Sequence, residues 1–368
     1  MKQFKVVDLF SGCGGFSYGF ESAGFQVVLG VDNDAMALKT FTKNHKNSKS
    51  LELDLHDDDA IDKIIKSLGN NTIDIIIAGP PCQGFSLTGA RKEEDARNKL
   101  FYSVFKLAKR IKPKAIIIEN VPGLATLYDG KAKEAILEEF SRLGFKSNYQ
   151  VLYAPEYEVP QIRKRIFFVG LLAELGKFKF PEPVLTEGDF NTCKDAIDDL
   201  PTLEDNLGSE VDIYDKLALS PYQERMRNGN NVLYNHVGAK HTDHVINVIS
   251  QVPEGCNYKS LPPGVGDSRR FNEAWTRYHS LRPSKTIDTG HRNHFHYKLN
   301  RVPTVRENAR LQSFPDCFVF YGNKTQQNKQ VGNAVPPLLG YHIAKQLFNF
   351  LNKKEHAREK YKLQAEHY

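Results

Sequence analysis

The feature of the sequence that most constrains the fold is a series of short apolar runs, each followed by a helical pattern. Residues 4–9 are predicted as a first strand, and the runs at 73–78 and 115–118 are nearly continuous in apolar residues, as expected for strands buried on both faces. Similar runs occur at 27–31 and 166–169. Strands that alternate with helices at this spacing favour a parallel sheet covered by helices. The sequence therefore predicts an α/β fold with a Rossmann-like, doubly wound, mostly parallel sheet.

The periodicity is lost after about residue 175, where Pro, Gly, Asn and His become frequent. This change predicts a second, smaller and irregular domain over residues 176–324. The first domain would then consist of residues 1–175 together with residues 325–368, because the chain regains a helical pattern near its end.

The helical signals near the end of the chain are specific. Thr304 and Glu307 fit a capping box that opens a short helix, which Pro315 should end. Pro337 suits the first position of a final helix, in which apolar residues recur at helical spacing. We expect this helix to pack on the first domain and to fray along the charged tail from Lys353.

The composition excludes several classes of protein. Of the 368 residues, 40% are hydrophobic and 26% are charged, which is typical of globular chains. No apolar run approaches the roughly 18 residues of a membrane span, and the first eight residues lack the pattern of a signal peptide. The five cysteines include no C-x-x-C pair, so neither a disulfide framework nor a metal cluster is expected. We expect a cytoplasmic protein without metal.

The net charge of +6 is concentrated in one segment. Residues 222–301 hold 12 Lys and Arg against 6 Asp and Glu, together with seven of the 12 histidines and the only tryptophan, Trp275. Basic side chains interleaved with aromatic rings suit a nucleic-acid surface, which offers both phosphates and base edges. A solvated, loop-rich face would have the same composition, so composition alone leaves both interpretations open.

A glycine-rich turn, Phe-Ser-Gly-Cys-Gly-Gly at residues 10–15, lies directly between the first predicted strand and a helix. Glycines let a turn approach a ligand closely and point its N–H groups at it. Asp32 ends the next strand, where a carboxylate can bind both ribose hydroxyls of a nucleoside. The turn departs from G-x-G-x-x-G and suits a ligand without a pyrophosphate, such as S-adenosylmethionine. Tight packing alone would explain such a turn about as often, and Asp32 favours the nucleoside site.

Cys82 follows a buried strand, in the sequence Gly-Pro-Pro-Cys-Gln-Gly-Phe-Ser at residues 79–86. Ligands of open α/β sheets bind beyond the carboxyl ends of the strands, so we expect this thiol to open into the cofactor crevice. Two prolines restrict the backbone before it, and an ionised thiol is a strong nucleophile. Most cysteines are small buried hydrophobic residues, which is our interpretation of Cys193, Cys256 and Cys317.

With the glycine turn, this Pro-Pro-Cys block resembles the DNA (cytosine-5)-methyltransferases. Further segments follow in the family's order: Glu-Asn-Val at 119–121, Gln-Ile-Arg-Lys-Arg at 161–165, Arg-Glu-Asn-Ala-Arg-Leu-Gln-Ser-Phe-Pro at 306–315 and Gln-Val-Gly-Asn-Ala-Val-Pro-Pro at 330–337. The matching segments extend from residue 8 to residue 337 and cover most of the chain. The compact length is similar to that of the bacterial restriction–modification members.

The resemblance implies methyl transfer from S-adenosylmethionine to carbon 5 of cytosine, which leaves S-adenosylhomocysteine. Carbon 5 is a poor nucleophile, and addition of the Cys82 thiolate to carbon 6 would activate it. Glu119 would neutralise charge at N3 of the base, and apolar surroundings should raise its pKa. Arg165 would contact the target base, and Arg163 would support the catalytic loop. Gln161 alternates with both arginines, so all three should share one face of a strand.

For the cofactor, the resemblance implies contacts from distant parts of the chain. The glycine turn would surround the methionine part, Asp32 would bind the ribose, and Asp54 would bind the adenine amino group. Three further aspartates at 57–59 lie near Asp54 and compete with it for this role. The expected cofactor residues are Phe10, Gly12, Cys13, Gly14, Gly15, Asp32, Asn33, Asp54, Leu55, Pro80, Leu100, Asn333 and Val335.

A cytosine inside a duplex must be flipped out of the stack before carbon 5 can react, at a cost of a few kcal/mol. The segment 86–99 is similar to the loop that closes over the flipped base in this family. Base contacts are expected from 266–270 and 291–294 in the target-recognition region, because Arg favours guanine and Asn favours adenine. The expected DNA-binding residues are Ser86, Arg91, Arg97, Gln161, Arg269, Arg270, Arg292 and Asn293.

Other activities fit the sequence less well. A tRNA cytosine-5 methyltransferase of the same family would have Pro-Phe-Thr after the Pro-Pro-Cys-Gln block, where this chain has Gly84 and Ser86. A catalytically inactive DNA-binding relative would lack Cys82 or Glu119, and a dehydrogenase would leave Cys82 unexplained. We therefore expect a bacterial DNA methyltransferase that acts as a monomer on double-stranded DNA, in a restriction–modification system with a cognate endonuclease as its genetic partner.

Overall fold

The computed structural model describes residues 3–81, 96–265, 275–289 and 293–365. The chain forms two compact units. Unit 1 is formed by Met1–Leu152, Lys164–Glu182 and Leu339–Tyr368, and unit 2 by Tyr153–Arg163 and Pro183–Leu338. Residues 153–163 and 325–338, which we expected in the first domain, thus cluster with the second unit.

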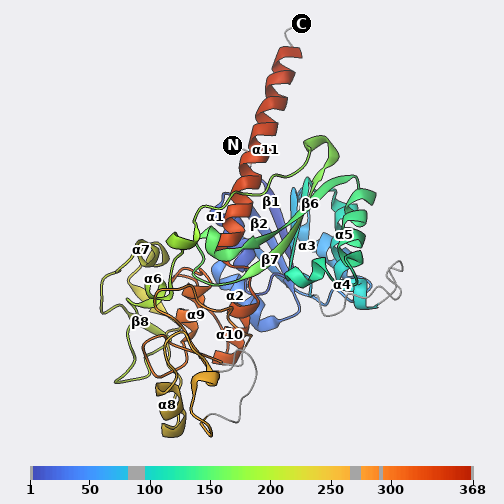
Figure 1. Ribbon diagram of the computed structural model, residues 1–368. Coiled ribbons are helices and arrows are strands. Elements are labelled where there is room, and N and C mark those ends of the chain that lie inside the picture. Colours follow the sequence, from blue (N-terminus) through green and yellow to red (C-terminus); the bar gives the residue numbers. More distant parts are fainter. Residues whose placement is uncertain (1–2, 82–95, 266–274, 290–292, 366–368) are drawn as a thin grey trace. The chain divides into compact units, whose positions relative to one another are not determined.

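Unit 1 is built on a seven-stranded sheet (Figure 1). Its strands are β1 (Lys5–Leu9), β2 (Gln26–Asp32), β3 (Lys49–Glu52), β4 (Ile75–Ala78), β5 (Ala115–Asn120), β6 (Phe145–Tyr153) and β7 (Lys164–Leu172). They lie in the order β3-β2-β1-β4-β5-β7-β6. The pairs from β3 through β5 are parallel, whereas β7 runs antiparallel to β5. The predicted α/β fold with a mostly parallel sheet is therefore confirmed.

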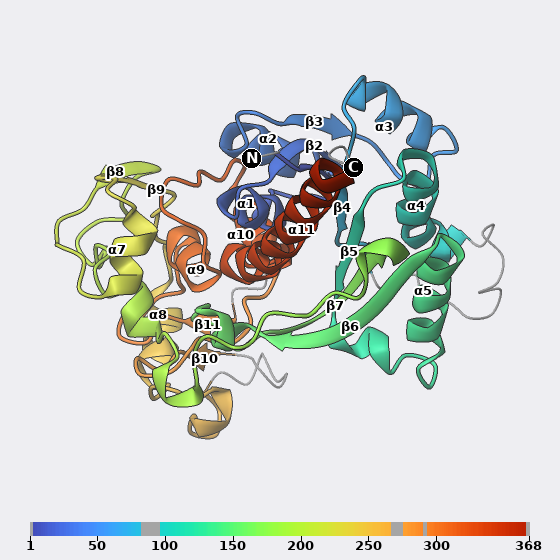
Figure 2. The ribbon, with the colours of Figure 1, turned by 90° about the horizontal axis from the view of Figure 1, so that it is seen from above.

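Helices cover both faces of this sheet (Figure 2). They are α1 (Gly15–Ser22), α2 (Ala35–Asn44), α3 (Ala60–Leu68), α4 (Ala96–Ile111), α5 (Lys131–Arg142) and α11 (Pro337–Ala365). On one face, α3, α4 and α5 share an apolar cluster with the strands, to which Ile64 and Phe140 contribute. On the other face, Phe348 of α11 contacts the rings of Phe4 and Phe25. The final helix thus packs on the first sheet, as predicted.

The local helix signals predicted from the sequence are confirmed. Thr304 caps α9 (Val305–Leu311) in a capping box with Glu307, and Pro337 is the first residue of α11. The charged tail behaves differently, because α11 continues to Ala365 instead of fraying from Lys353. A tertiary ion pair explains part of this difference, since Lys114 lies 2.7 Å from the carboxylate of Glu355 and anchors that turn of the helix.

Unit 2 consists of short elements joined by long connections. It contains α6 (Cys193–Ile197), α7 (Pro221–Arg227), α8 (Asp243–Ser250), α9, α10 (Lys324–Asn333) and the strand pairs β8 (Val211–Ile213) with β9 (Val232–Tyr234) and β10 (Thr276–Arg277) with β11 (His294–Phe295). Buried ion pairs help to hold it together: the Arg310 guanidinium binds the carboxylates of Asp199 and Asp316. Buried charges are tolerated when they are paired and hydrogen-bonded in this way.

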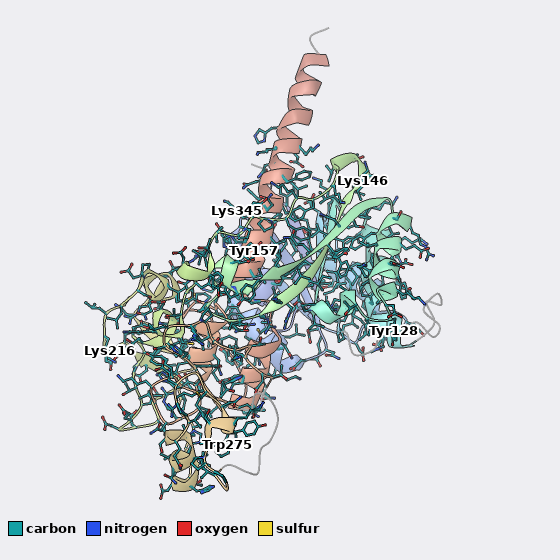
Figure 3. All side chains as sticks on the ribbon, in the orientation of Figure 1. Tyr128, Lys146, Tyr157, Lys216, Trp275 and Lys345 are labelled. Carbon is teal, nitrogen blue, oxygen red and sulfur yellow. The ribbon has the colours of Figure 1, made fainter. Side chains whose placement is uncertain are left out.

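The only tryptophan of the chain belongs to this interior. Trp275, labelled in Figure 3, is 7% exposed, and its ring meets that of Phe295 edge-on at 5.9 Å. Val248 and Ile249 belong to the same small apolar cluster. The tryptophan is therefore a core residue of unit 2. None of the helices in the described part of the chain has both the length and the apolar character of a membrane span.

Candidate cofactor and catalytic site

The candidate site lies at one edge of the sheet in unit 1, where four parallel strands end. The strand register aligns the carboxyl ends of β2, β1, β4 and β5, in that order. Asp32, Phe10, Gly79 and Glu119 follow the aligned residues of these four strands. A hydrogen bond from the Gly79 N–H to the carbonyl of Leu9 continues the pairing of β4 with β1 one residue beyond the end of β4. Ligands of open α/β sheets bind at this edge.

The glycine turn after β1 has an unusual backbone. Phe10, Gly12 and Gly14 all have positive φ, at 61°, 53° and 96°, a conformation that costs energy for a bulky residue such as Phe10. Two hydrogen bonds fix the turn, from Ser11 N–H to the carbonyl of Val31 and from Gly14 N–H to the carbonyl of Ser11. No described atom lies within 4 Å of the point that a Cβ of Gly12 would occupy, so a ligand has room to approach there.

Asp32 binds the turn while keeping capacity for a ligand. Its Oδ2 accepts the Gly12 N–H at 2.7 Å, and its Oδ1 accepts the Asp34 N–H at 2.9 Å. A carboxylate has about four acceptor positions in all, so these N–H groups leave capacity for a further donor. Burial raises the pKa of Asp32 above its usual value, and hydrogen bonds from the backbone N–H groups of Asp34, Gly12 and Asn33 partly offset that effect. A ribose, which presents two neighbouring hydroxyl donors, fits this acceptor pair.

Beneath the turn, Asp8 is buried near the end of β1 and accepts a 2.6 Å hydrogen bond from the Ser17 hydroxyl of α1. Burial raises the pKa of the Asp8 carboxyl from 3.8 to about 8. Since this pKa is higher in the folded than in the unfolded chain, the folded state binds an extra proton between about pH 4 and pH 8. The stability that Asp8 contributes must therefore fall as the pH rises through that window.

We expect Asp8→Asn to separate this contribution from those of other groups. Asparagine still accepts the Ser17 hydrogen bond but cannot ionise. The unfolding free energy of the variant should therefore rise relative to that of wild type by up to about 1.4 kcal/mol per pH unit between pH 5 and pH 8. Urea unfolding of both proteins at several pH values measures the difference in unfolding free energy. A difference that is the same at pH 5 and pH 8.5 would contradict a raised pKa for Asp8.

The other expected cofactor residues in unit 1 differ in their environments. Asp54 is exposed, and the backbone N–H and ring of His56 bind its carboxylate at 2.9 Å and lower its pKa. Leu55 is buried in the apolar cluster beneath α3, and Leu100 packs against the same cluster. Asn33 is exposed, whereas Pro80 is buried. The Leu55 side chain thus belongs to the core, and the roles of these residues towards a cofactor stay predictions.

The cysteines outside the Pro-Pro-Cys block are not equivalent. Cys13, within the glycine turn, is buried, and burial raises the pKa of its thiol to about 12, so this thiol is inert at neutral pH. Cys193 is buried as predicted, whereas Cys256 is half-buried. The prediction for Cys317 is wrong, because this side chain is exposed near the turn that follows α9.

Glu119, at the end of β5, forms an ion pair with Arg165 of β7. The Nε of Arg165 lies 2.8 Å from Oε1 of Glu119, with side chains 16% and 12% exposed respectively. The other carboxylate oxygen, Oε2, lies 3.5 Å from the point that a Cβ of Gly79 would occupy. An acid is thus fixed beside the first residue of the Gly-Pro-Pro-Cys block.

Asn120 is a site residue that the sequence analysis missed. Its side-chain amide donates a 2.9 Å hydrogen bond to the Pro80 carbonyl, and its Oδ1 accepts the Val121 N–H. The bond fixes the backbone two residues before Cys82. The only signal in the sequence is a polar amide at the end of an apolar strand, and the pairing of β4 with β5 reveals its burial and its partner.

Arg163 and Gln161 lie in unit 2 and are both buried. Arg163 donates hydrogen bonds to the carbonyls of Gly332 at 3.0 Å and Ala334 at 3.2 Å. It thereby holds the segment of Asn333 and Val335, whose role towards a cofactor stays a prediction. β7 begins at Lys164, and Gln161 forms an isolated bridge with Ser284. We had expected the three residues at 161, 163 and 165 to share one face of a strand. This prediction is wrong, because only Arg165 lies in β7.

Several predicted site residues fall outside the described part of the chain. They are Cys82, Ser86, Arg91, Arg269, Arg270 and Arg292, together with the side chain of Arg97. Their predicted roles remain predictions.

The basic segment 222–301 contains fewer available cations than its composition indicated. Arg277 is buried, and its guanidinium binds four backbone carbonyls and the Asn300 side chain. Ion pairs join three more arginines to carboxylates: Arg225 to Glu158, Arg227 to Asp199 and Arg301 to Glu307. Asn293 is 6% exposed and donates its amide to Asp288 at 2.8 Å. These side chains have structural partners that sequence alone did not reveal.

Comparison with known proteins agrees with these features. The family model described as C-5 cytosine-specific DNA methylase matches residues 4–349. The Type II methyltransferase M.DdeI of Desulfomicrobium norvegicum is 35% identical over 368 residues, which cover 93% of this chain and 88% of that protein. The Type II methyltransferase M1.HphI of Haemophilus parahaemolyticus is 39% identical over 345 residues, covering 92% and 85%.

Solved structures agree as well. A putative DNA modification methyltransferase encoded within an E. coli prophage matches with a TM-score of 0.77 at 28% identity, covering 95% of this chain and 100% of that one. The S. pombe Dnmt2 methyltransferase matches with a TM-score of 0.59 at 15% identity, over 95% and 100% of the two chains, which shows the fold alone. The chain therefore belongs to the C-5 cytosine-specific DNA methylases, of the kind found among type II restriction–modification methyltransferases.

Proposed function

We propose that the chain transfers the methyl group of S-adenosylmethionine to carbon 5 of a flipped-out cytosine, within a short specific sequence of double-stranded DNA. The observation that carries the proposal is the alignment of Asp32, Phe10, Gly79 and Glu119 at one sheet edge. The groups expected to bind the cofactor and those expected to bind the base lie on neighbouring strands.

The cofactor side of the site is formed by the turn and Asp32. When bound, S-adenosylmethionine supplies an electrophilic methyl group on a sulfonium ion. The Asp32 carboxylate, already fixed by the Gly12 and Asp34 N–H groups, accepts the ribose hydroxyls. The open space at Gly12 lets the backbone approach the methionine part.

The base side of the site consists of the Pro-Pro-Cys block and the Glu119–Arg165 pair. The Cys82 thiolate adds its electron pair to carbon 6, so that carbon 5 becomes nucleophilic and would accept the methyl group, while the bond between that methyl group and the sulfonium sulfur breaks and leaves S-adenosylhomocysteine. Glu119 hydrogen-bonds N3 and stabilises the charge that develops there, and Arg165 keeps the carboxyl in place. Loss of the proton from carbon 5 and expulsion of the thiolate then restore the aromatic ring and the enzyme.

Unit 2 supplies sequence recognition in this proposal. One part of it is unsuited to DNA, because Glu204, Asp205, Glu210 and Asp215 are all exposed there and would repel phosphates. Base contacts are instead proposed for residues 266–270 and for His291 and Arg292, because Asn293 is buried and donates its amide to Asp288. The chain acts as a monomer in the cytoplasm, requires no metal and protects DNA from a cognate endonuclease.

Bisulfite sequencing tests the proposal directly. The chain is expressed in bacteria that lack their own cytosine-5 methylases, and their DNA is converted and sequenced. We expect unconverted cytosines at one position of one short sequence, and complete conversion when an Asp32→Ala variant is expressed instead. Complete conversion of DNA with the wild-type chain, accompanied by unconverted cytosine in tRNA, would contradict a DNA substrate.

A further inference from the structure

The glycine turn is supported from below by two stacked rings. Phe41 near the end of α2 and His45, its capping residue, stack with ring centroids 4.3 Å apart and planes at 30°. A Cβ on Gly14 would lie 2.1 Å from the His45 ring and 2.9 Å from the Phe41 ring. A Cβ on Gly30 of β2 would lie 2.4 Å from the Phe41 ring. Glycine at both positions thus makes room for the ring pair.

A carboxylate fixes the orientation of the histidine. Nδ1 of His45 lies 2.7 Å from Oε2 of Glu21 in the last turn of α1, and the Ser48 hydroxyl donates to Oε1 of Glu21 at 3.3 Å. The imidazole is completely buried, so its hydrogen bond is not competed for by solvent. One ring therefore connects the end of α1, the end of α2 and the glycine turn.

We propose that His45, oriented by Glu21, is a positioning residue for cofactor binding. The ring pair holds Gly14 in its left-handed conformation, and Gly14 in turn holds the Gly12 N–H against Asp32. The turn is thus ordered before the cofactor arrives, and ordering entropy is not lost on binding. This inference rests on the proposed function, because it assigns the turn to S-adenosylmethionine.

The structure offers a matched control for simple packing. On the opposite face of the same sheet, Phe140 of α5 packs under Gly170 of β7, where a Cβ would lie 2.3 Å from the ring. Phe140 and Phe41 are both completely buried. Phe41→Leu and Phe140→Leu should therefore lower the unfolding free energy to a similar extent, while only Phe41 lies against the turn.

The experiment compares His45→Ala, Phe41→Leu and Phe140→Leu with the wild-type chain. We measure the affinity for S-adenosylhomocysteine by titration calorimetry and the hydrogen exchange of peptides covering residues 10–16 without cofactor. His45→Ala and Phe41→Leu should weaken binding about tenfold, equivalent to about 1.4 kcal/mol, and should speed exchange in the turn. Phe140→Leu should change neither, and kcat at saturating cofactor should stay within about twofold in all three.

Two variants of Glu21 test the orientation of the ring. Glu21→Gln keeps an acceptor for the His45 Nδ1–H and should bind the cofactor product like wild type, whereas Glu21→Ala should resemble His45→Ala. Wild-type affinity and wild-type exchange in folded His45→Ala would overturn the proposal, and so would equal weakening by Phe140→Leu. If the wild-type chain itself binds no S-adenosylhomocysteine, the proposed function fails, while faster turn exchange in His45→Ala would still support the positioning role.

Discussion

Replacing Cys82 with alanine should lower methyl transfer below the detection limit, while DNA affinity stays within about threefold of wild type. The reason is chemical. Without a nucleophile at carbon 6, carbon 5 stays within an aromatic ring and does not attack a methyl group at a useful rate. The side chain is small, and the phosphate contacts that dominate DNA affinity come from other residues.

The measurement combines transfer of a tritiated methyl group to DNA with gel-shift titration. The matched control is Cys317→Ala, which removes an exposed thiol and should keep wild-type turnover. Residual turnover of Cys82→Ala above a hundredth of wild type would contradict the nucleophile assignment. Loss of DNA binding in the same variant would instead indicate that Cys82 has a structural role.

Replacing Glu119 with glutamine should lower kcat by about 10²- to 10⁴-fold, the usual loss when a positioned acid is removed. Glutamine has nearly the same shape and can still accept a hydrogen bond from Arg165. The substitution therefore leaves no cavity beside the partly buried Arg165 side chain. The KM for the cofactor should change little, because the Asp32 carboxylate and the Gly12 N–H are held independently.

A double-mutant cycle with Arg165→Lys examines whether the ion pair acts as a unit. If Arg165 serves mainly to orient Glu119, its replacement should cost much less in the Glu119→Gln background than in wild type. Additive losses would contradict a shared role, and a kcat of Glu119→Gln within tenfold of wild type would remove the acid from the mechanism.

The central part of the fold was predictable because its strands are buried on both faces. β4 is entirely apolar and β5 begins with four apolar residues, so these sequences differ clearly from helices and loops. β1 has three apolar residues beside Lys5 and Asp8. β3 and β6 were missed because they lie at the two edges of the sheet. Their side chains are largely half-buried or exposed, so neither strand has a continuous apolar run.

The site was predictable to the extent that it depends on local sequence. The glycine turn and Asp32 are recognisable from their positions at the ends of consecutive strands. In contrast, the Asn120 hydrogen bond to Pro80 depends on the pairing of β4 with β5, which the local sequence does not reveal. The support of Gly14 by His45 depends on how α2 folds back under the turn. Burial of Arg277 and Trp275 is likewise a tertiary property, and for that reason composition overstated the basic and aromatic surface of unit 2.

The most direct test of the mechanism uses a duplex in which 5-fluorocytosine replaces cytosine at the methylated position found by bisulfite sequencing. Fluorine cannot leave from carbon 5 as a proton does, so the enzyme should stop as a covalent complex. In the presence of S-adenosylmethionine, denaturing electrophoresis should reveal a one-to-one adduct, and peptide mass spectrometry should locate it on Cys82. Methylation of ordinary duplex without any adduct on the fluorinated one, or an adduct on another residue, would contradict addition of Cys82 to the base.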